Sequence, residues 1–167
     1  MGSSEVVVAD TSPILNLALI DQTACLHQQF DSVRIPRAVR EELLAGQRKR
    51  ERLETLLNRP FFTVESVSRN DLVREFRSEL DRGESEALAL AIEQSADLVL
   101  IDERDGRKVA RRHDLRVTGV VGVLIRAAKN GTLSLEPALR SLREAGFWIS
   151  DDLVQQAIAA VESEEDR

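Results

Sequence analysis

Hydrophobic residues along the chain occur in short continuous runs separated by longer stretches with helical spacing. Residues 5–9 and 98–101 are mostly aliphatic, which is typical of strands buried on both faces of a parallel sheet. Shorter runs at 33–35, 61–64 and 115–118 also predict strands. Between them, apolar residues recur every three to four positions. This alternation of strands and helices indicates βαβ units, so we expect an α/β protein with a central parallel sheet.

Turn and capping residues predict where the helices begin and end. The first helix should start just after Asp10, capped by Thr11 or Ser12, with Pro13 in its first position. Residues 84–93 are apolar nearly all round, so this helix should be buried. Helical spacing also runs through Leu15 and Leu19 and, after a break, through Leu26 and Phe30. Another helix is predicted to begin near Arg37. Further helices are predicted over residues 47–58, 71–80 (ending near Gly83), 105–113, 119–129, 137–145 and 151–162.

The length and composition predict one domain over residues 5–163, because 167 residues with 43% hydrophobic content can form a substantial core. Residues 1–4 are set aside as a candidate cloning remnant, and residues 164–167 are expected to form a frayed acidic tail. The single cysteine, Cys25, excludes an intramolecular disulfide, and with only two histidines a structural zinc site is not expected. Neither a signal peptide nor a membrane-spanning run is visible, which favours a soluble, cytoplasmic protein.

The net charge of −6 argues against a nucleic-acid partner at first, but it does not describe local surfaces. Basic residues gather at 47–52 and in the predicted helix that follows the second strong strand, where Arg104, Arg107 and Lys108 are candidates for RNA binding. The alternative is that both clusters are solvated helix faces. Aromatic residues are only 4% and tyrosine is absent, so contacts to phosphates would have to dominate over base stacking.

Acidic residues are the strongest candidates for chemistry. Asp10 and Asp102 each end a predicted strand, and parallel strands bring their carboxyl ends to one edge of the sheet. Glu86 lies one turn into the buried helix, and Glu41 and Glu42 lie on the helix that begins near Arg37. Each residue alone is also explained as a turn residue, a surface acid or an acid that favours a helix N-terminus.

A cluster of such acids would need a cation. Two carboxylates ~5 Å apart repel by roughly 3 kcal/mol at an effective dielectric of 20. Several together must therefore protonate in part or bind a metal ion. Oxygen ligands without histidine or cysteine favour hard ions, so we expect Mg²⁺ or Mn²⁺. Such an ion can activate water and stabilise charge on a phosphoryl group.

The motifs resemble those of PIN-domain proteins, and in particular a VapC-like branch of PIN-related sequences. The likeness runs from about Val6 to Trp148 in the same order along the chain, and five motifs in order make it fairly specific. The segments that carry it are Val8–Leu17, Ile35–Leu43, Gly83–Ala87, Leu100–Arg107 and Val117–Leu124.

The resemblance implies a three-layer α/β/α sandwich around a parallel sheet and metal-dependent hydrolysis of RNA phosphodiester bonds. Carried over by position, the catalytic acids are Asp10, Glu42, Glu86 and Asp102. Metal ligands would be Asp10, Glu86 and either Asp102 or Glu103, with Thr11 and Ser12 orienting the site. Two positions depart from the family pattern, namely Glu86, where many relatives have Asp, and Asp102-Glu103, which replaces a Thr-x-Asp or Thr-x-Asn motif. The family also implies a toxin with an antitoxin partner.

Two other functions stay open on the sequence. One is a PIN scaffold without strong catalysis that binds nucleic acid or a protein partner. The other is a receiver- or phosphatase-like domain with Asp10 as phosphoacceptor, which is disfavoured because Ser12 stands where a second Asp is needed. A homodimer is also expected, from the family and from apolar residues of the C-terminal helices: Leu139, Leu142, Phe147 and Trp148.

Overall fold

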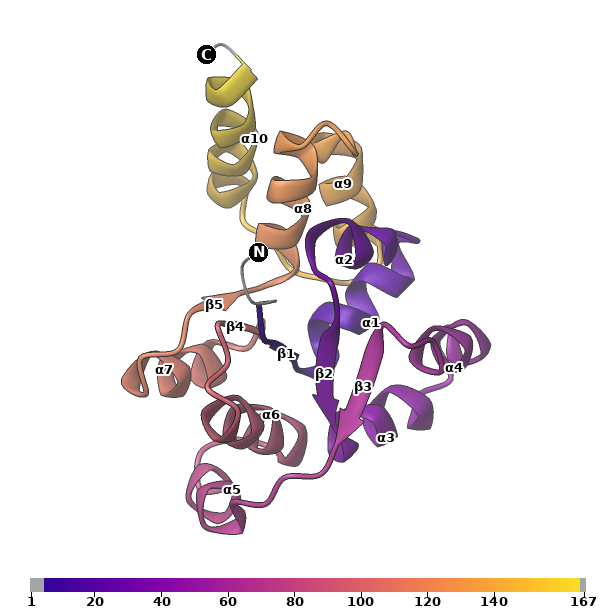
Figure 1. Ribbon diagram of the computed structural model, residues 1–167. Coiled ribbons are helices and arrows are strands. Elements are labelled where there is room, and N and C mark those ends of the chain that lie inside the picture. The colour runs from indigo at the N-terminus through magenta and orange to yellow at the C-terminus, as the bar shows by residue number, and fades with distance from the viewer. Residues whose placement is uncertain (1–4, 166–167) are drawn as a thin grey trace.

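The computed structural model describes residues 5–165, with side chains up to residue 163. Five parallel strands form one sheet in the order β3-β2-β1-β4-β5 (Figure 1). Their bounds are β1 Val7–Ala9, β2 Val33–Pro36, β3 Phe62–Glu65, β4 Leu98–Leu100 and β5 Val117–Thr118. The five predicted strands are confirmed. The short aliphatic strand β1 lies at the centre of the sheet, where its side chains are buried on both faces.

Ten helices accompany these strands in the described residues. They are α1 Thr11–Leu19, α2 Ala24–Gln29, α3 Arg37–Ala45, α4 Arg50–Leu57, α5 Asn70–Phe76, α6 Arg82–Glu93, α7 Arg104–Arg112, α8 Val120–Lys129, α9 Leu135–Glu144 and α10 Asp151–Glu165. None of them is long and apolar enough to cross a membrane. Residues 164–165 of the predicted tail belong to α10, and residues 166–167 lie outside the described part of the chain.

Alternating side chains of the central strands divide the core into two layers. Val7 and Ala9 of β1 pack with α1, α2, α3, α4, α8, α9 and α10 on one face of the sheet. Val8 of β1, with Val99 and Ile101 at β4, packs with α5, α6 and α7 on the other face. Since successive side chains of a strand point to opposite faces, this division makes three layers. The predicted α/β/α sandwich is therefore confirmed.

Among the helix boundaries that differ from the prediction, two lie near the strand ends. Asp10, rather than Thr11 or Ser12, is the N-cap of α1, so both hydroxyl residues lie inside the helix. Gly83 does not end the preceding helix but is the second residue of α6, because the Asp81 carboxylate accepts a hydrogen bond from the Glu84 N–H and caps that helix. Both differences bring polar side chains towards the carboxyl ends of the strands.

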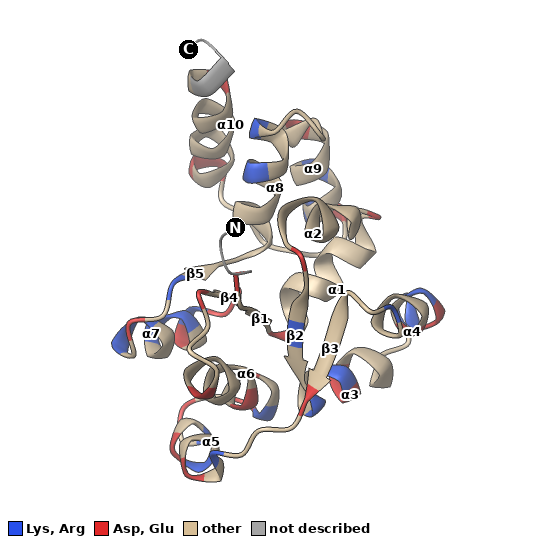
Figure 2. Cartoon of the chain, viewed as in Figure 1, with Lys and Arg blue, Asp and Glu red and all other residues tan. Residues whose placement is uncertain are grey.

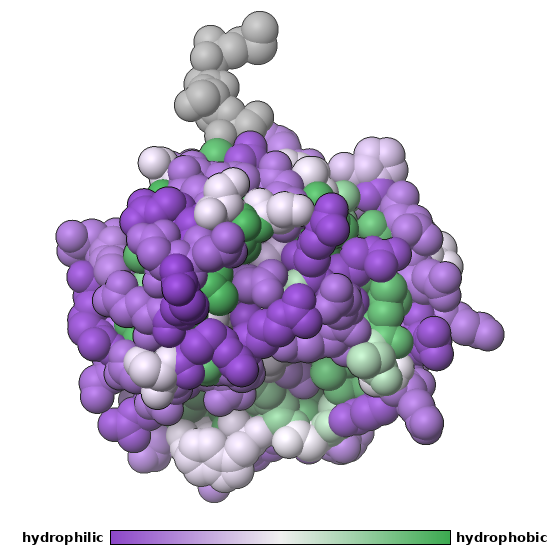
Figure 3. All heavy atoms as spheres, turned by 90° about the horizontal axis from the view of Figure 1, so that it is seen from below, coloured by the Kyte–Doolittle hydropathy of each residue, from purple (hydrophilic) through white to green (hydrophobic). Residues whose placement is uncertain are grey.

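The carboxyl ends of the strands point towards the lower end of the molecule in Figure 1, where α3, α5 and α6 also lie. Figure 3 views the molecule from this end, and the surface there is mostly hydrophilic. The strand ends therefore open onto a polar face.

Candidate functional site

Asp10 is the most buried acid at the carboxyl edge of the sheet. It follows β1, its backbone N–H donates to the Leu100 carbonyl over 2.9 Å, and only 3% of the residue is exposed. Burial raises the pKa of its carboxyl group to about 7, and a hydrogen bond from the Thr11 backbone opposes this only in part. The charges of Asp81, Glu42 and Asp102 raise the pKa further. Acids from three other parts of the chain thus act on Asp10.

Glu42 is held at this edge by two hydrogen bonds. The Thr11 hydroxyl donates to its Oε2 over 2.5 Å, and the Gly83 N–H donates to its Oε1 over 3.1 Å. A Cβ atom on Gly83 would lie 2.5 Å from Oε2, so the absence of a side chain lets α6 approach the carboxylate of α3 this closely. The Thr11 hydroxyl and the glycine together fix where the Glu42 charge lies.

Asp102 directly follows the residue after β4 and faces the start of α8. Its Oδ2 accepts a hydrogen bond from the Ser12 hydroxyl over 3.2 Å, and its Oδ1 accepts one from the Val120 N–H over 2.8 Å. Burial raises the pKa of Asp102, while these two hydrogen bonds and the charge of Arg107 lower it. The neighbouring Glu103 is exposed and adds a small repulsion.

Two acids that sequence analysis did not predict lie in the same cluster. Glu84 is 8% exposed, and burial raises the pKa of its carboxyl group to about 8. A hydrogen bond to the Asp81 side chain raises this pKa next, followed by the charges of Asp81, Asp10 and Glu103. The sequence signal was Asp81-x-x-Glu84, the pattern of a helix capping box, which indicates a helix start but not that Glu84 is buried.

Glu86 is placed differently. Its Oε1 accepts a 3.4 Å hydrogen bond from the Ala38 N–H at the start of α3, and its Oε2 pairs with Arg82 Nε at 3.0 Å. Positions 84 and 86 of a helix are rotated by roughly 200° from one another, so both side chains cannot face the same group. Glu86 is not among the charges that act most strongly on Asp10, Glu84 or Asp102.

We call the acids that act on one another here the acidic cluster: Asp10, Glu42, Asp81, Glu84, Asp102 and Glu103. In the described residues, no three of their carboxylates, or of other candidate ligands, are already grouped tightly enough to hold a metal ion. The donor chemistry nevertheless suits a hard divalent ion, because every donor is a carboxylate oxygen. Three of these carboxyl groups, Asp10, Glu84 and Asp102, are also destabilised in their charged form by burial, which a cation would relieve.

The three predicted RNA-binding residues lie on α7, where Figure 2 shows basic positions close to acidic ones. Arg104 and Lys108 are exposed, whereas Arg107 is partly buried. The Nε of Arg107 has no hydrogen-bond partner among the described residues. The basic face of α7 therefore begins beside Asp102.

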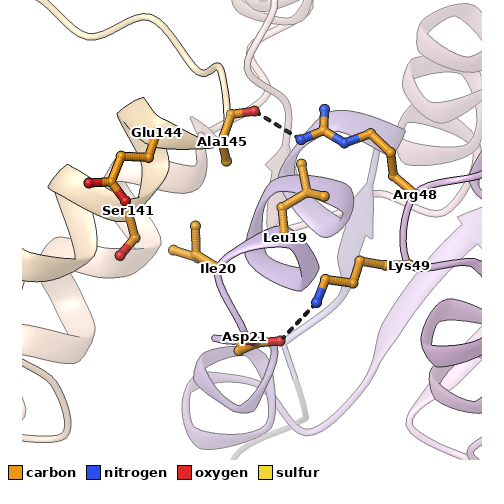
Figure 4. A pocket seen from close by; sticks show the side chains of 8 residues that line it. All are labelled: Leu19, Ile20, Asp21, Arg48, Lys49, Ser141, Glu144 and Ala145. Atoms are coloured by element: carbon orange, nitrogen blue, oxygen red, sulfur yellow. Dashed lines mark hydrogen bonds and ion pairs between the residues drawn. The ribbon is translucent and has the colours of Figure 1, made fainter.

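A surface pocket of about 570 Å³ lies elsewhere (Figure 4). It is formed by the end of α1, the loop before α4 and the end of α9. Two contacts join residues that line it: Arg48 Nη2 donates to the Ala145 carbonyl over 3.0 Å, and Lys49 Nζ lies 3.6 Å from Asp21 Oδ1. It adjoins the C-terminal end of α1, and Asp10 lies at the other end, roughly 14 Å along the helix axis. None of the predicted site residues lines this pocket.

The structure is thus a parallel α/β/α sandwich with acids gathered at the carboxyl edge of the sheet. Residues 6–163 match the family model of the PIN domain, and the chain belongs to this family. PIN domains are generally nucleases that use divalent metal ions and act on nucleic acid. Comparison with curated proteins gives no match. The resemblance to the PIN family is thus confirmed, while the VapC-like branch stays a prediction.

Proposed function

We propose that this PIN domain is an endoribonuclease that needs Mg²⁺ or Mn²⁺ and acts at the acidic cluster. The observation that carries the proposal is the burial of Asp10 and Glu84 side by side with other acids at the carboxyl edge of the sheet. Carboxyl groups whose pKa is strongly raised by burial and neighbouring charges cluster at functional sites.

The residues that would hold the ion are Asp10, Glu84 and Asp102, with Glu42 and Glu103 as further oxygen donors. When bound, a divalent ion supplies a polarised water and stabilises negative charge on a phosphate. The chain itself positions the acids: Ser12 and the Val120 N–H orient Asp102, and Thr11 and the Gly83 N–H orient Glu42. This proposal replaces Glu86 by Glu84, since the carboxylate of Glu86 is already engaged by Arg82 and the start of α3.

The experiment is cleavage of a mixed pool of RNA by the full chain. We expect cleavage with Mn²⁺ or Mg²⁺ and none with EDTA, and Asp10→Asn should abolish it. Cleavage that persists in EDTA would contradict the metal requirement, and cleavage by Asp10→Asn would place the reaction elsewhere.

A second candidate is a PIN scaffold with weak or no catalysis that binds nucleic acid or a protein. The observation in its favour is that the described carboxylates are not already grouped as a metal site and that Glu42 and Asp102 are engaged by protein donors. RNA binding by the wild type without cleavage at any metal concentration would favour this candidate.

The resemblance extends the proposal to the toxin of a toxin–antitoxin pair, with an antitoxin as protein partner. Induced expression of the wild type should then arrest growth, whereas Asp10→Asn should not. Normal growth with an active nuclease would contradict the toxin function and leave the nuclease proposal intact.

A further inference from the structure

Arg107 is a cation at the border of the acidic cluster without a partner for one of its buried donors. It lies in the first turn and a half of α7, and of the four basic side chains from Arg104 to Arg111 it is the one that is partly buried. Its Nε is shielded from solvent and makes no hydrogen bond in the described part of the chain. Leaving a buried donor without a hydrogen bond is unfavourable, and more so for a charged group.

The start of α7 packs closely against the acidic cluster. A Cβ atom on Gly106 would lie 2.4 Å from Ile101 Cδ1 and 3.0 Å from Glu84 Oε2. The glycine therefore lets the start of α7 lie directly on β4 and α6, and the next residue, Arg107, is carried to the side of Asp102. The charge of Arg107 lowers the pKa of Asp102, so the two groups are within electrostatic range.

The other basic residues of α7 are in different situations. Arg112 Nη2 is bound to both carboxylate oxygens of Glu79, at 2.9 and 3.0 Å. Arg104, Lys108 and Arg111 are exposed to solvent. Charges of exposed side chains contribute little to the stability of the fold. No ion pair of the described residues includes Arg107, although its charge acts on Asp102.

We propose that Arg107 is a phosphate-binding residue, whose guanidinium contacts a non-bridging oxygen of the RNA phosphate that enters the acidic cluster. This inference rests on the proposed function, because it assumes that a phosphodiester reaches these acids. A planar guanidinium presents paired Nη donors that suit two oxygens of one phosphate, whereas a lysine would contact it only as a point charge. It would also offset the repulsion between the acids and the RNA backbone.

The test uses the full chain, the variants Arg107→Ala and Arg107→Lys, and Arg111→Ala as a matched control on the same helix. Binding of a short fluorescein-labelled single-stranded RNA is measured by anisotropy in EDTA, over a series of salt concentrations. Arg107→Ala should weaken binding about tenfold or more and lower the slope of log Kd against log salt by about 0.7–1, the loss of one phosphate contact. Arg111→Ala should change both quantities much less.

Cleavage kinetics with Mn²⁺ give an independent measurement. Arg107→Lys should keep most of the salt-dependent binding but lose about tenfold in kcat/KM, because it keeps the charge and lacks the paired donors. Melting temperatures of all variants establish that they are folded. If Arg107→Ala and Arg111→Ala bind and cleave alike, the inference is overturned. Absence of cleavage by the wild type, with RNA binding that still depends on Arg107, would overturn the nuclease proposal and support the phosphate contact. Absence of RNA binding by the wild type would overturn both.

Discussion

At the scale of single residues, the main electrostatic feature is the raised pKa of the buried Asp10 carboxyl group. This group is almost fully buried at the end of β1 and has a pKa of about 7, compared with an ordinary value of 3.8. The unfolded chain therefore releases this proton at lower pH than the folded chain. Between about pH 4 and pH 7, the folded state binds more protons than the unfolded state, so without metal the Asp10 contribution destabilises the fold increasingly as pH rises.

This gives a prediction for Asp10→Asn without metal. The amide keeps the volume but never ionises, so the variant should be more stable than the wild type by on the order of a few kcal/mol at pH 8. The difference should shrink as pH falls from 7 towards 4 and nearly vanish below 4, where Asp10 is protonated in both states. Urea unfolding in EDTA at several pH values measures it. A difference that is independent of pH would show that Asp10 is not the titrating group.

The choice between Glu84 and Glu86 is a second prediction at this scale. We expect Glu84→Gln to reduce metal-dependent cleavage by about a hundredfold, since changing even the outer-shell partners of a metal typically costs about 10–100-fold and the amide removes the charge of a ligand. Glu86→Gln should retain most of the activity, because that side chain contacts Arg82 and the Ala38 N–H instead of the acidic cluster. The two variants are matched in chemistry and differ only in helix face. The reverse result would restore the ligand set predicted from the sequence.

At the scale of elements, the order of strands and helices could be predicted from the sequence because it depends on periodicity. The aliphatic runs at β1 and β4 are continuous, and two acids directly after them had to lie at one edge of a parallel sheet. What could not be predicted is which side of α6 faces that edge. Glu84 and Glu86 both lie near the start of α6, and only the packing of Gly83 on Glu42 and of Gly106 beside Glu84 decides between them.

The approach of α6 to α3 gives a prediction for Gly83→Ala. The new Cβ would collide with the Glu42 carboxylate, which is the end of a flexible side chain and can swing away. Helical stability should be unchanged or higher by up to ~1 kcal/mol, because alanine favours a helix over glycine. RNA cleavage should nevertheless fall, since Glu42 loses its place. Unchanged cleavage and unchanged stability together would indicate that the position of Glu42 is not needed.

At the scale of the whole molecule, the C-terminal helices α9 and α10 pack on the sheet through α8 and contribute to its larger core. Leu139 and Leu142 are 1% and 0% exposed in that core, so two of the apolar residues on which the homodimer was predicted are already covered within the chain. Phe147 is partly buried, and Trp148 is 83% exposed. Among the residues named for the interface, Trp148 is thus the one that a partner could still bury.

A homodimer through this surface stays a prediction. Sedimentation at high micromolar concentration should show a species of twice the 18.7 kDa chain mass, and Trp148→Ala should shift it towards the monomer. Only an 18.7 kDa species in the wild type would contradict the prediction.

The most direct test of a metal-dependent acidic cluster is a titration of the wild type and Asp10→Asn with Mn²⁺, followed by melting temperature at pH 8. Metal bound to the folded state alone stabilises it by about 2.7 kcal/mol at a concentration a hundred times Kd. We predict that Mn²⁺ raises the melting temperature of the wild type, reduces the stability advantage of Asp10→Asn, and leaves that variant unchanged. An equal response of the two proteins, or no response of either, would contradict the account.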